Sequence, residues 1–470
     1  AVELRVERHG VILKGKKRRR ESTRLPAAAE ARRSAPGEQL GLDSATTHPH
    51  PRSMDDHAEL VIAGAGLSGM LLALACAGAG LQVAIVDPQN PAAMLEHRFD
   101  GRTSAIAYGS RLVFDGIGLW PQIAAEAEPI REIRVADDNS PLFVHYDSRD
   151  LDPGAGTPLG YIVENRVLRH ALLAHARALP TLKLLMPRRI MAMEASDNAA
   201  TAMLDGGEQL RARLVVAADG KGSPLRRDAG IGAVEWRYRQ TGIVMTVAHE
   251  RPHAGIAVEH FLPAGPFAIL PMTDESSDDA AHARRGRSSI VWTEDNALAP
   301  RLLALPEAEF AAELGARFGG FLGAIEPVGP RWSYPLALMQ ADRYVARRLA
   351  LIGEAAHVIH PIAGQGLNIG IRDVAALAEL IVDARRRGLD IGEDAVLGRY
   401  QRWRRTDALL LAAVTDGLNR LFSNTVPPVR LVRDLGLAMV NRLPPLKRLL
   451  MQHAMGVLGE RPRLARGQPL

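Results

Sequence analysis

The stretch that decides the fold is Glu59-Leu60-Val61-Ile62-Ala63-Gly64-Ala65-Gly66-Leu67-Ser68-Gly69. Its first five residues predict a short buried strand, and the Leu- and Ala-rich residues 70–79 predict a helix after the glycine turn. A second apolar strand is expected over residues 82–86 and ends at Asp87, which is placed to accept hydrogen bonds from ribose hydroxyls. Strand, glycine turn, helix and second strand in this order form the unit that binds the pyrophosphate of a dinucleotide.

The glycines of this turn have separate tasks. Gly64 permits the tight turn, Gly66 lets the backbone approach a pyrophosphate, and Gly69 lets the helix and the strand pack closely. Leu67 and Ser68 belong to the turn just before the expected helix, and the N–H groups and partial positive charge of a helix N-terminus favour phosphate. The unit by itself does not separate FAD from NAD.

Two later stretches repeat a buried strand that ends near a glycine. Residues 214–218 lead into Asp219, and residues 349–352 lead into Gly353 and Glu354. An Asp-Gly turn after a strand is common in proteins, so the first of these stretches leaves a plain turn and a cofactor site equally open.

A glycine-rich loop follows the last of these strands. Such a loop ahead of a helix, which we expect to begin near Ile371, presents backbone N–H groups to an anion. His357 and His360 are three residues apart, but no third ligand or cysteine cluster accompanies them, so the sequence predicts no metal site. The loop and its flanks are His360-Pro361-Ile362-Ala363-Gly364-Gln365-Gly366-Leu367-Asn368-Ile369-Gly370-Ile371-Arg372-Asp373.

This loop resembles the signature of the ubiquinone-biosynthesis hydroxylases, a group of single-component flavin aromatic hydroxylases that includes bacterial polyprenyl-phenol hydroxylases and their mitochondrial relatives. Shorter matches lie at residues 100–106, 160–166 and 415–422. The resemblance therefore covers residues 59 to about 424, which is nearly all of the expected folded chain.

The resemblance implies FAD as the cofactor and NAD(P)H as a transient co-substrate. Asp219 would serve both, and Glu354 would contact the ribityl chain, where the family usually has the shorter Asp. The residues that it places at FAD are Arg102, Arg166, Asp219, Gly353, Glu354, Gly364, Gly366, Leu367 and Asn368. The residues that it places beside the flavin ring are Pro361, Gly364, Gln365 and Gly366.

The reaction that the resemblance implies is hydroxylation of the ring of a polyprenylated phenol in ubiquinone biosynthesis, with NAD(P)H and O2. Side chains provide no oxygen electrophile, whereas a reduced flavin forms a C4a-hydroperoxide that the ring carbon attacks. The sequence identifies no side-chain base. Two alternatives stay open: a flavin hydroxylase or oxidoreductase for another aromatic or isoprenoid substrate, and a non-catalytic flavoprotein subunit of a quinone-biosynthesis complex.

The expected fold is α/β, with a Rossmann-type FAD-binding domain, an inserted antiparallel β-sheet substrate domain and C-terminal helices. The FAD-binding domain is expected in three parts, at residues 54–135, 166–226 and 343–400. Short β-rich runs separated by Pro and Gly predict the substrate sheet over residues 227–342, joined by a β segment at residues 136–165.

The C-terminal region, residues 401–470, is expected to be helical. Helices are predicted over residues 400–421, 429–441 and 446–458, with apolar residues among Arg and Lys. Such helices either pack as a pair on the body of the protein or rest on a membrane surface, where a prenylated substrate would reside.

Composition narrows the class of protein. A chain of 470 residues, 47% of them hydrophobic, is long enough for a large core. Residues 1–53 contain 12 Lys and Arg against 6 Asp and Glu, and the remainder is nearly balanced, so nucleic acid is not expected as a partner. Cys76 is the only cysteine, so no intrachain disulfide can form. The expected location is therefore the cytoplasm, at the inner membrane face if the C-terminal helices bind there. Residues 1–53 are expected to be a disordered extension, and residues 274–288 a polar hairpin tip.

Overall fold

The computed structural model describes residues 57–95, 100–137, 143–151, 156–274, 286–422, 439–440 and 442–470. The expected extension over residues 1–53 lies outside the described residues, as do most of the expected hairpin tip at 274–288 and of the expected helix at 429–441. None of the helices in the described ranges is long and apolar enough to cross a membrane.

A six-stranded sheet carries all three glycine motifs of the sequence. Within the described part of the chain, its strands lie in the order β18 (Val345–Ala346), β19 (Leu349–Leu351), β12 (Leu214–Ala217), β1 (Leu60–Ala63), β2 (Val83–Val86) and β8 (Leu182–Leu185). All neighbours from β19 to β8 are parallel, so the carboxyl ends of β19, β12, β1 and β2 meet at one edge. The strand ends that the sequence singled out therefore lie side by side, at the edge where α/β sheets bind ligands.

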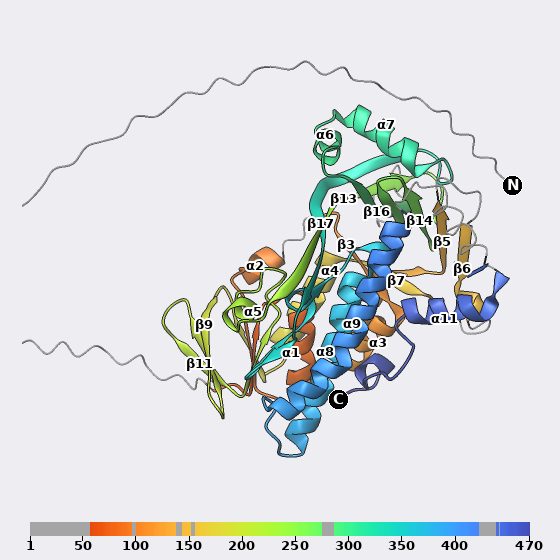
Figure 1. Cartoon of the computed structure of the whole chain (residues 1–470). Helices are drawn as coiled ribbons and strands as arrows, with labels where there is room; N and C mark the ends of the chain where they lie inside the picture. The colour runs from red at the N-terminus through yellow and green to blue at the C-terminus, as the bar shows by residue number, and fades with distance from the viewer. Residues whose placement is uncertain are drawn as a thin grey trace, which may run out of the picture. The chain divides into compact units, whose positions relative to one another are not determined.

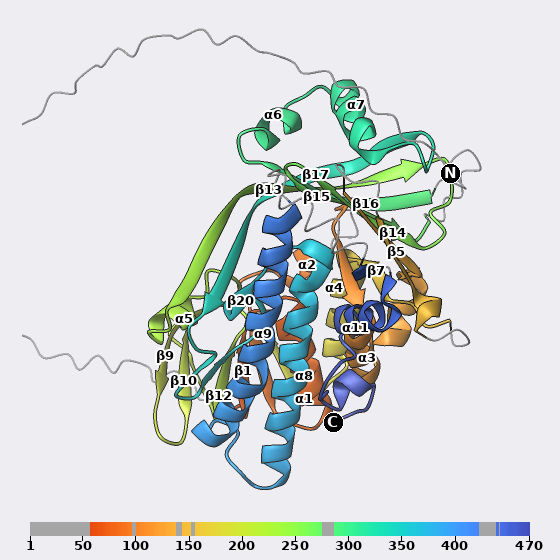
Figure 2. The same ribbon diagram turned by 45° about the vertical axis from the view of Figure 1, so that its right-hand side comes forward.

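Three helices cover this sheet or pack beside it. They are α1 (Leu67–Gly78), α4 (Asn165–Arg177) and α8 (Gln365–Arg386). Helix α8 packs against α1 and also against the long helix α9 (Asp394–Phe422), which runs beside it in Figures 1 and 2. The prediction that the last glycine loop leads into a helix near Ile371 was wrong in its start, because Gly364 takes a left-handed conformation, φ 61°, and the helix begins directly after it.

An eight-stranded sheet forms the second layer of the fold. Its order, within the described residues, is β20 (His357–Val358), β17 (Ile325–Ala341), β13 (Ala233–His249), β16 (Gly286–Asp295), β15 (Gly265–Met272), β14 (Ile256–Leu262), β5 (Glu132–Asp137) and β6 (Phe143–Asp147). Every neighbouring pair is antiparallel except β14 and β5. The inserted antiparallel sheet that the sequence predicted is thus confirmed.

The expected β segment at residues 136–165 is divided between two sheets. Strands β5 and β6 extend the eight-stranded sheet, starting four residues before the expected boundary. Strand β7 (Gly160–Glu164) instead pairs with β3 (Thr103–Ala107) and β4 (Ala127–Ile130). The division of the chain into domains stays a prediction.

The remaining elements are a small sheet and six further α-helices of the described residues. A small sheet contains β9 (Ile190–Ala195), β10 (Ala200–Leu204) and β11 (Gln209–Ala212). The other helices are α2 (Pro91–Met94), α3 (Tyr108–Ile117), α5 (Pro224–Asp228), α6 (Ala299–Leu303), α7 (Glu307–Phe318) and α11 (Pro444–Ala454). Helices α6 and α7 lie over β13, β16 and β17 in Figure 1, and their core contains Trp292 and Phe310. Helices α9 and α11 confirm two of the expected C-terminal helices.

The last glycine motif is held by a buried ion network around Asp373 of α8. One oxygen of this fully buried carboxylate accepts hydrogen bonds from the Gly353 N–H, at 3.1 Å, and from His357 Nε2, at 2.6 Å. The other oxygen accepts from Arg404 Nε of α9, at 2.8 Å. Burial opposes ionisation of Asp373, but the charges and hydrogen bonds of His357 and Arg404 outweigh it and hold its pKa below the usual range.

We expect Asp373→Asn to lower the free energy of unfolding by about 3 kcal/mol, because it leaves the buried Arg404 charge without one of its partners. The measurement is the urea midpoint of the purified protein. The control is Glu313→Gln, which removes an exposed ion pair with Arg317 on α7 and is expected to change stability by less than about 0.5 kcal/mol. Equal effects of the two variants would contradict the role given to Asp373.

Candidate cofactor and substrate site

The glycine turn after β1 is shaped by two close backbone contacts. Gly64 has φ 102°, and a Cβ placed there would lie 2.3 Å from the carbonyl oxygen of Ala218, which follows β12. A Cβ at Gly69 would lie 2.0 Å from the carbonyl oxygen of Gly64. Gly66 differs, because a Cβ there would meet nothing within 4 Å. Two glycines therefore satisfy packing, and the third leaves the backbone open to a ligand.

Asp87, at the end of β2, holds the same turn. Its Oδ2 accepts a hydrogen bond from the Ala65 N–H at 2.7 Å, and its Oδ1 accepts from the Gln89 N–H at 2.7 Å. The carboxylate thus fixes the glycine turn to the neighbouring strand. Its contact with ribose stays a prediction.

Two helix N-termini meet at this edge of the sheet. No side chain in the described residues caps the first turn of α1 or of α8. Ser68, in the first turn of α1, lies close to the last glycine motif. A Cβ added at Gly353 would lie 3.0 Å from the Ser68 Oγ, and a Cβ added at Gly370 would lie 2.8 Å from it. Gly366, in the first turn of α8, is exposed and open in the same way as Gly66. Two open N-termini favour a diphosphate.

Asp219 offers an acceptor beside these N-termini, since it follows β12 between β1 and β19. Its Oδ1 is buried and has no hydrogen-bond partner among the described residues. Burial raises the pKa of this carboxyl, against a hydrogen bond from Ser223. A buried acceptor of this kind is suited to a donor on a bound molecule. Glu354 lies exposed directly after Gly353. These residues fit FAD, with its diphosphate and its ribityl and ribose hydroxyls.

Arg102 and Arg166 lie close together, although 64 positions separate them in the sequence. The carbonyl oxygen of Arg102 accepts a hydrogen bond from the N–H of Asn165, the residue before Arg166. The Arg102 guanidinium pairs with Asp100 and lies 5.0 Å from the centre of the Trp332 ring, whereas Arg166 Nε donates to Glu164 at 2.5 Å. Their contact with FAD stays a prediction.

A cavity of about 620 Å³ lies between the eight-stranded sheet, the start of α8, α9 and α11. Its wall is almost entirely apolar. Four of the residues that the sequence placed near the flavin ring or at FAD line it, namely Pro361, Gly364, Gln365 and Asn368. The fold thus joins the expected flavin site to an apolar chamber of the size that ligand sites have.

Asn368 fixes the loop at the inner end of this cavity. Its Oδ1 accepts from the Ala107 N–H at 2.8 Å, and its Nδ2 donates to the carbonyl oxygens of Ala105, at 2.9 Å, and Gly364, at 2.8 Å. A Cβ at Gly364 would lie 2.6 Å from the Cβ of Ala105. The structure gives Asn368 a positioning role between β3 and α8, and a direct contact with the cofactor stays a prediction.

Glu259 of β14 is a site residue that the sequence analysis missed. It is the only acidic residue among the described residues that line the cavity, and burial raises the pKa of its carboxyl to about 7. A signal was present in the sequence. Side chains of a strand alternate between two faces, so Glu259 shares a face with Ala257 and Phe261, and a carboxylate on an apolar strand face is a frequent mark of a functional site.

His357 and His360 do not form a common site. His357 Nε2 is paired with Asp373, whereas His360 Nε2 lies 3.3 Å from Gln240 Oε1. The His360 ring also packs edge-on against Tyr238, with 5.1 Å between ring centres. The geometry therefore assigns both rings to the packing around the site.

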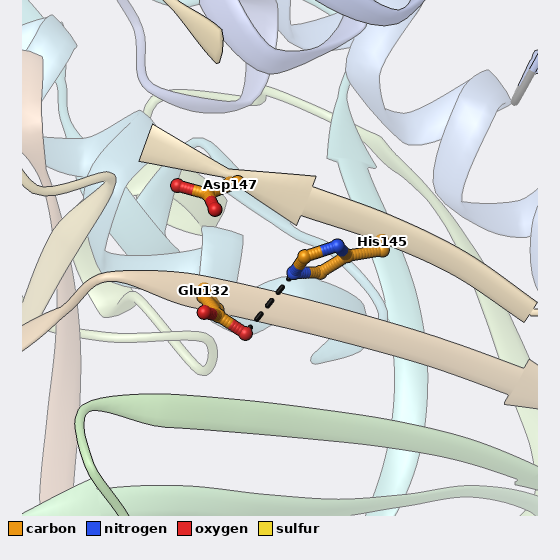
Figure 3. A group of neighbouring side chains, drawn as sticks. All are labelled: Glu132, His145 and Asp147. Atoms are coloured by element: carbon orange, nitrogen blue, oxygen red, sulfur yellow. Dashed lines mark hydrogen bonds and ion pairs between the residues drawn. The ribbon is translucent and has the colours of Figure 1, made fainter. Parts of the chain in front are cut away.

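Figure 3 shows a second group of ligand-type side chains, Glu132 of β5 with His145 and Asp147 of β6. Their ligand atoms lie within 4.8 Å of one another, and Glu132 Oε2 is 3.0 Å from His145 Nε2. Arg134 and Arg149 already pair with the two carboxylates, at 3.0 and 2.5 Å. Because these guanidinium groups would repel a cation, we interpret the group as an ion-pair network.

Comparison with known proteins agrees with this geometry. The family model described as an FAD-binding domain matches residues 57–408. Ubiquinone hydroxylase UbiL of Rhodospirillum rubrum is 51% identical over 437 residues, covering 92% of this chain and 98% of that protein. The 3-demethoxyubiquinol 3-hydroxylase of Escherichia coli is 35% identical, covering 85% and 98%. The crystal structure of p-nitrophenol 4-monooxygenase from Pseudomonas putida shares the fold, with a TM-score of 0.70, 20% identity, and 86% and 100% coverage.

The different roles of the glycines give a test. Gly66→Ala should fold normally but weaken FAD binding, because its methyl group enters open space at the helix N-terminus and displaces a phosphate from backbone N–H groups. Loss of one such hydrogen bond costs about 1.5–3 kcal/mol, which is roughly 10- to 100-fold in Kd. The measurement is quenching of FAD fluorescence on titration with apoprotein.

Two further variants are the controls. Gly64→Ala should lower the urea midpoint, because of the contact with Ala218 and the positive φ. Gly78→Ala, in an open position on the same helix, should leave FAD affinity unchanged. An unchanged FAD affinity in Gly66→Ala would show that no phosphate approaches this turn.

Proposed function

Because the chain belongs to the family defined by this FAD-binding domain and is an FAD-dependent monooxygenase, we propose that it hydroxylates the ring of a polyprenylated phenol in ubiquinone biosynthesis. The observation that carries the proposal is the apolar cavity of about 620 Å³, whose wall includes the loop expected beside the flavin ring. The names of the relatives, ubiquinone hydroxylase and 3-demethoxyubiquinol 3-hydroxylase, support the same substrate class.

The proposed reaction consumes one O2 and one NAD(P)H. One oxygen atom enters a ring C–H bond as a hydroxyl group, and the other leaves as water with the hydride and a proton. FAD supplies the two-electron chemistry that activates O2 when it is bound. The chain contributes placement: the glycine turn and two helix N-termini hold the diphosphate, and the cavity wall excludes water from the ring.

An isoprenoid tail needs an apolar path from the cavity to the surface. Val414 and Leu418 of α9 and Leu450 of α11 line the cavity and are also more than a third exposed. The cavity therefore reaches the surface between these two helices. A tail of isoprene units fits this apolar opening better than a small polar aromatic compound does.

We further propose that this opening lies against a membrane. The two helices that border it, α9 and α11, and the residues just before α11 carry exposed apolar side chains, whereas a surface that faces only water carries mostly polar residues. These apolar side chains are Leu409, Leu410, Val414, Leu418, Met439, Leu443, Leu449 and Leu450. Arg442 and Arg448 lie exposed in the same region and suit anionic lipid headgroups. This arrangement supports the membrane alternative of the sequence analysis for residues 401–470.

The proposed reaction predicts that the FAD-loaded protein converts a phenol with a short isoprenyl chain into its ring-hydroxylated product, with NAD(P)H and O2 consumed in equal amounts. The product is identified by mass spectrometry with labelled O2. The same phenol without its isoprenyl chain should have a higher KM, by roughly tenfold or more, because each buried CH2 contributes about 0.8 kcal/mol. Hydroxylation of both phenols with equal KM would contradict the substrate class.

Membrane contact predicts that Leu410→Glu with Leu449→Glu lowers binding to vesicles of phosphatidylcholine and phosphatidylglycerol by at least about tenfold, since each exposed leucine loses its burial in lipid. Co-sedimentation measures the bound fraction. The matched control is Leu389→Glu, an equally exposed leucine beyond the opposite end of α9, which should bind vesicles as the wild type does. Equal losses in both proteins would contradict a specific surface.

A further inference from the structure

We propose that Glu259 is the base that accepts the proton of the substrate phenol during ring hydroxylation. The inference rests on the proposed function, since it requires a phenol in the cavity. It adds a catalytic residue that no motif of the sequence identifies, and it assigns the polar end of the substrate to strand β14.

The first support is the position of Glu259 in the sheet. Its direct neighbours on the two adjacent strands are Val135 of β5 and Ala268 of β15. The same row continues to Val144 of β6 and to Val291 of β16. All five residues line the cavity, so Glu259 is the single polar side chain in a row of five across the sheet.

The second support is the state of the carboxylate. Among the described residues, the Glu259 side chain has no hydrogen bond or ion pair. By contrast, Glu164 of β7 and Glu294 of β16 each form an ion pair with an arginine. Desolvation alone raises its pKa to about 7. A carboxylate without a hydrogen-bond partner inside a protein lowers the stability of the fold. Such a group is therefore expected where a bound ligand supplies the missing hydrogen bond.

The third support is that Glu259 is the only carboxylate in the described wall of the cavity. Its other titratable side chains are Tyr146 of β6 and His453 of α11, and strands β5, β15 and β16 and helices α8 and α9 contribute none. Burial raises the pKa of Tyr146, which keeps it protonated and able to donate. Glu259 is thus the one carboxylate that faces the chamber from the described part of the sheet.

The proton balance is closed within the site. The O–H bond of the phenol breaks as its proton moves to a Glu259 oxygen, and the electron pair left on oxygen raises electron density at the ring carbon that receives oxygen. That carbon then loses its hydrogen as a proton and restores the aromatic ring. Glu259 returns its proton to the ring oxygen or to water and is ready for the next turnover. A pKa near 7 suits a group that both takes and gives a proton.

The first experiment compares product formation by the FAD-loaded wild type, Glu259→Gln and Glu259→Asp. In the wild type we expect the rate to rise with pH through the pKa of Glu259, because the ionised form is the base. Glu259→Gln should lose about 100-fold in rate and also this titration, and Glu259→Asp should keep the titration at a reduced rate. Tyr146→Phe should keep it too, and Glu313→Gln on α7 should match the wild type in full.

Substrate acidity separates a base from a structural residue. A fluorinated phenol ionises more readily, so the deficit of Glu259→Gln should shrink with it. A deficit that is the same for both phenols would overturn the proposal, as would an unchanged rate in Glu259→Gln. Failure of the wild type to hydroxylate any isoprenyl phenol would instead count against the proposed function.

The second experiment needs no turnover. A nitrophenol with a short isoprenyl chain is bound to the oxidised protein without NAD(P)H, and its phenolate absorbance is followed against pH. With Glu259 in contact, the phenol and the carboxylate share one proton, so the absorbance should appear at lower pH in the wild type than in Glu259→Gln. A carboxylate out of contact would give phenolate absorbance at the same pH in both proteins or, by repulsion, at higher pH in the wild type. Either result would overturn the proposal, as would a nitrophenol that does not bind.

Discussion

The buried carboxylate of Asp373 is the constraint on which the site depends. It lies in α8, but its hydrogen bonds go to Gly353 after β19, to His357 of β20, and to Arg404 of α9. These elements carry the last glycine motif, one edge strand of the eight-stranded sheet, and the helix that closes the cavity. Since an ion network inside a protein tolerates little displacement, it fixes the start of α8 relative to both sheets.

The start of α8 in turn joins the two halves of the site. Its second turn, at Gly370, lies next to Ser68 of α1, where the diphosphate is expected, and Asn368 ties its first turn to β3. The loop from Pro361 to Gly364 then forms part of the cavity wall. One helix N-terminus thus connects a polar region suited to phosphates with an apolar region suited to an aromatic ring. A shift of α8 would change both at once.

The parts of this fold that were predictable from sequence are those in which the signal is local. A buried strand, a glycine and a helix lie within about twenty residues of one another at Gly64, so their order fixes their geometry. The partners of β5 are a different case. It pairs in parallel with β14, more than a hundred residues later, and no local pattern distinguishes that partner from other β-rich runs.

In the candidate site, too, features with a local sequence signal were predictable and features that depend on distant contacts were not. The open backbone at Gly66 was predictable from the glycine motif. The hydrogen bond that Asp87 accepts from the Ala65 N–H was not, because it depends on how β2 lies against the turn. The start of α8 was misplaced because the left-handed conformation of Gly364 allows a helix to begin inside a glycine-rich loop. Glu259 has no motif because its role depends on its surroundings, and those come from strands and helices that are far apart in the sequence, among them β5, β15 and α9.

The two ends of the site differ in how charge is placed. At the end where the diphosphate is expected, the N-termini of α1 and α8 offer partial positive charges that are fixed and need no reorganisation when a cofactor binds. At the ring end, the wall is apolar, so any charge that develops there is poorly solvated and strongly affected by a single carboxylate. An apolar chamber with a single carboxylate in its described wall therefore discriminates by proton affinity as well as by shape. A ring with an acidic hydroxyl gives Glu259 a hydrogen-bond partner, and a ring without one leaves its carboxylate unpaired.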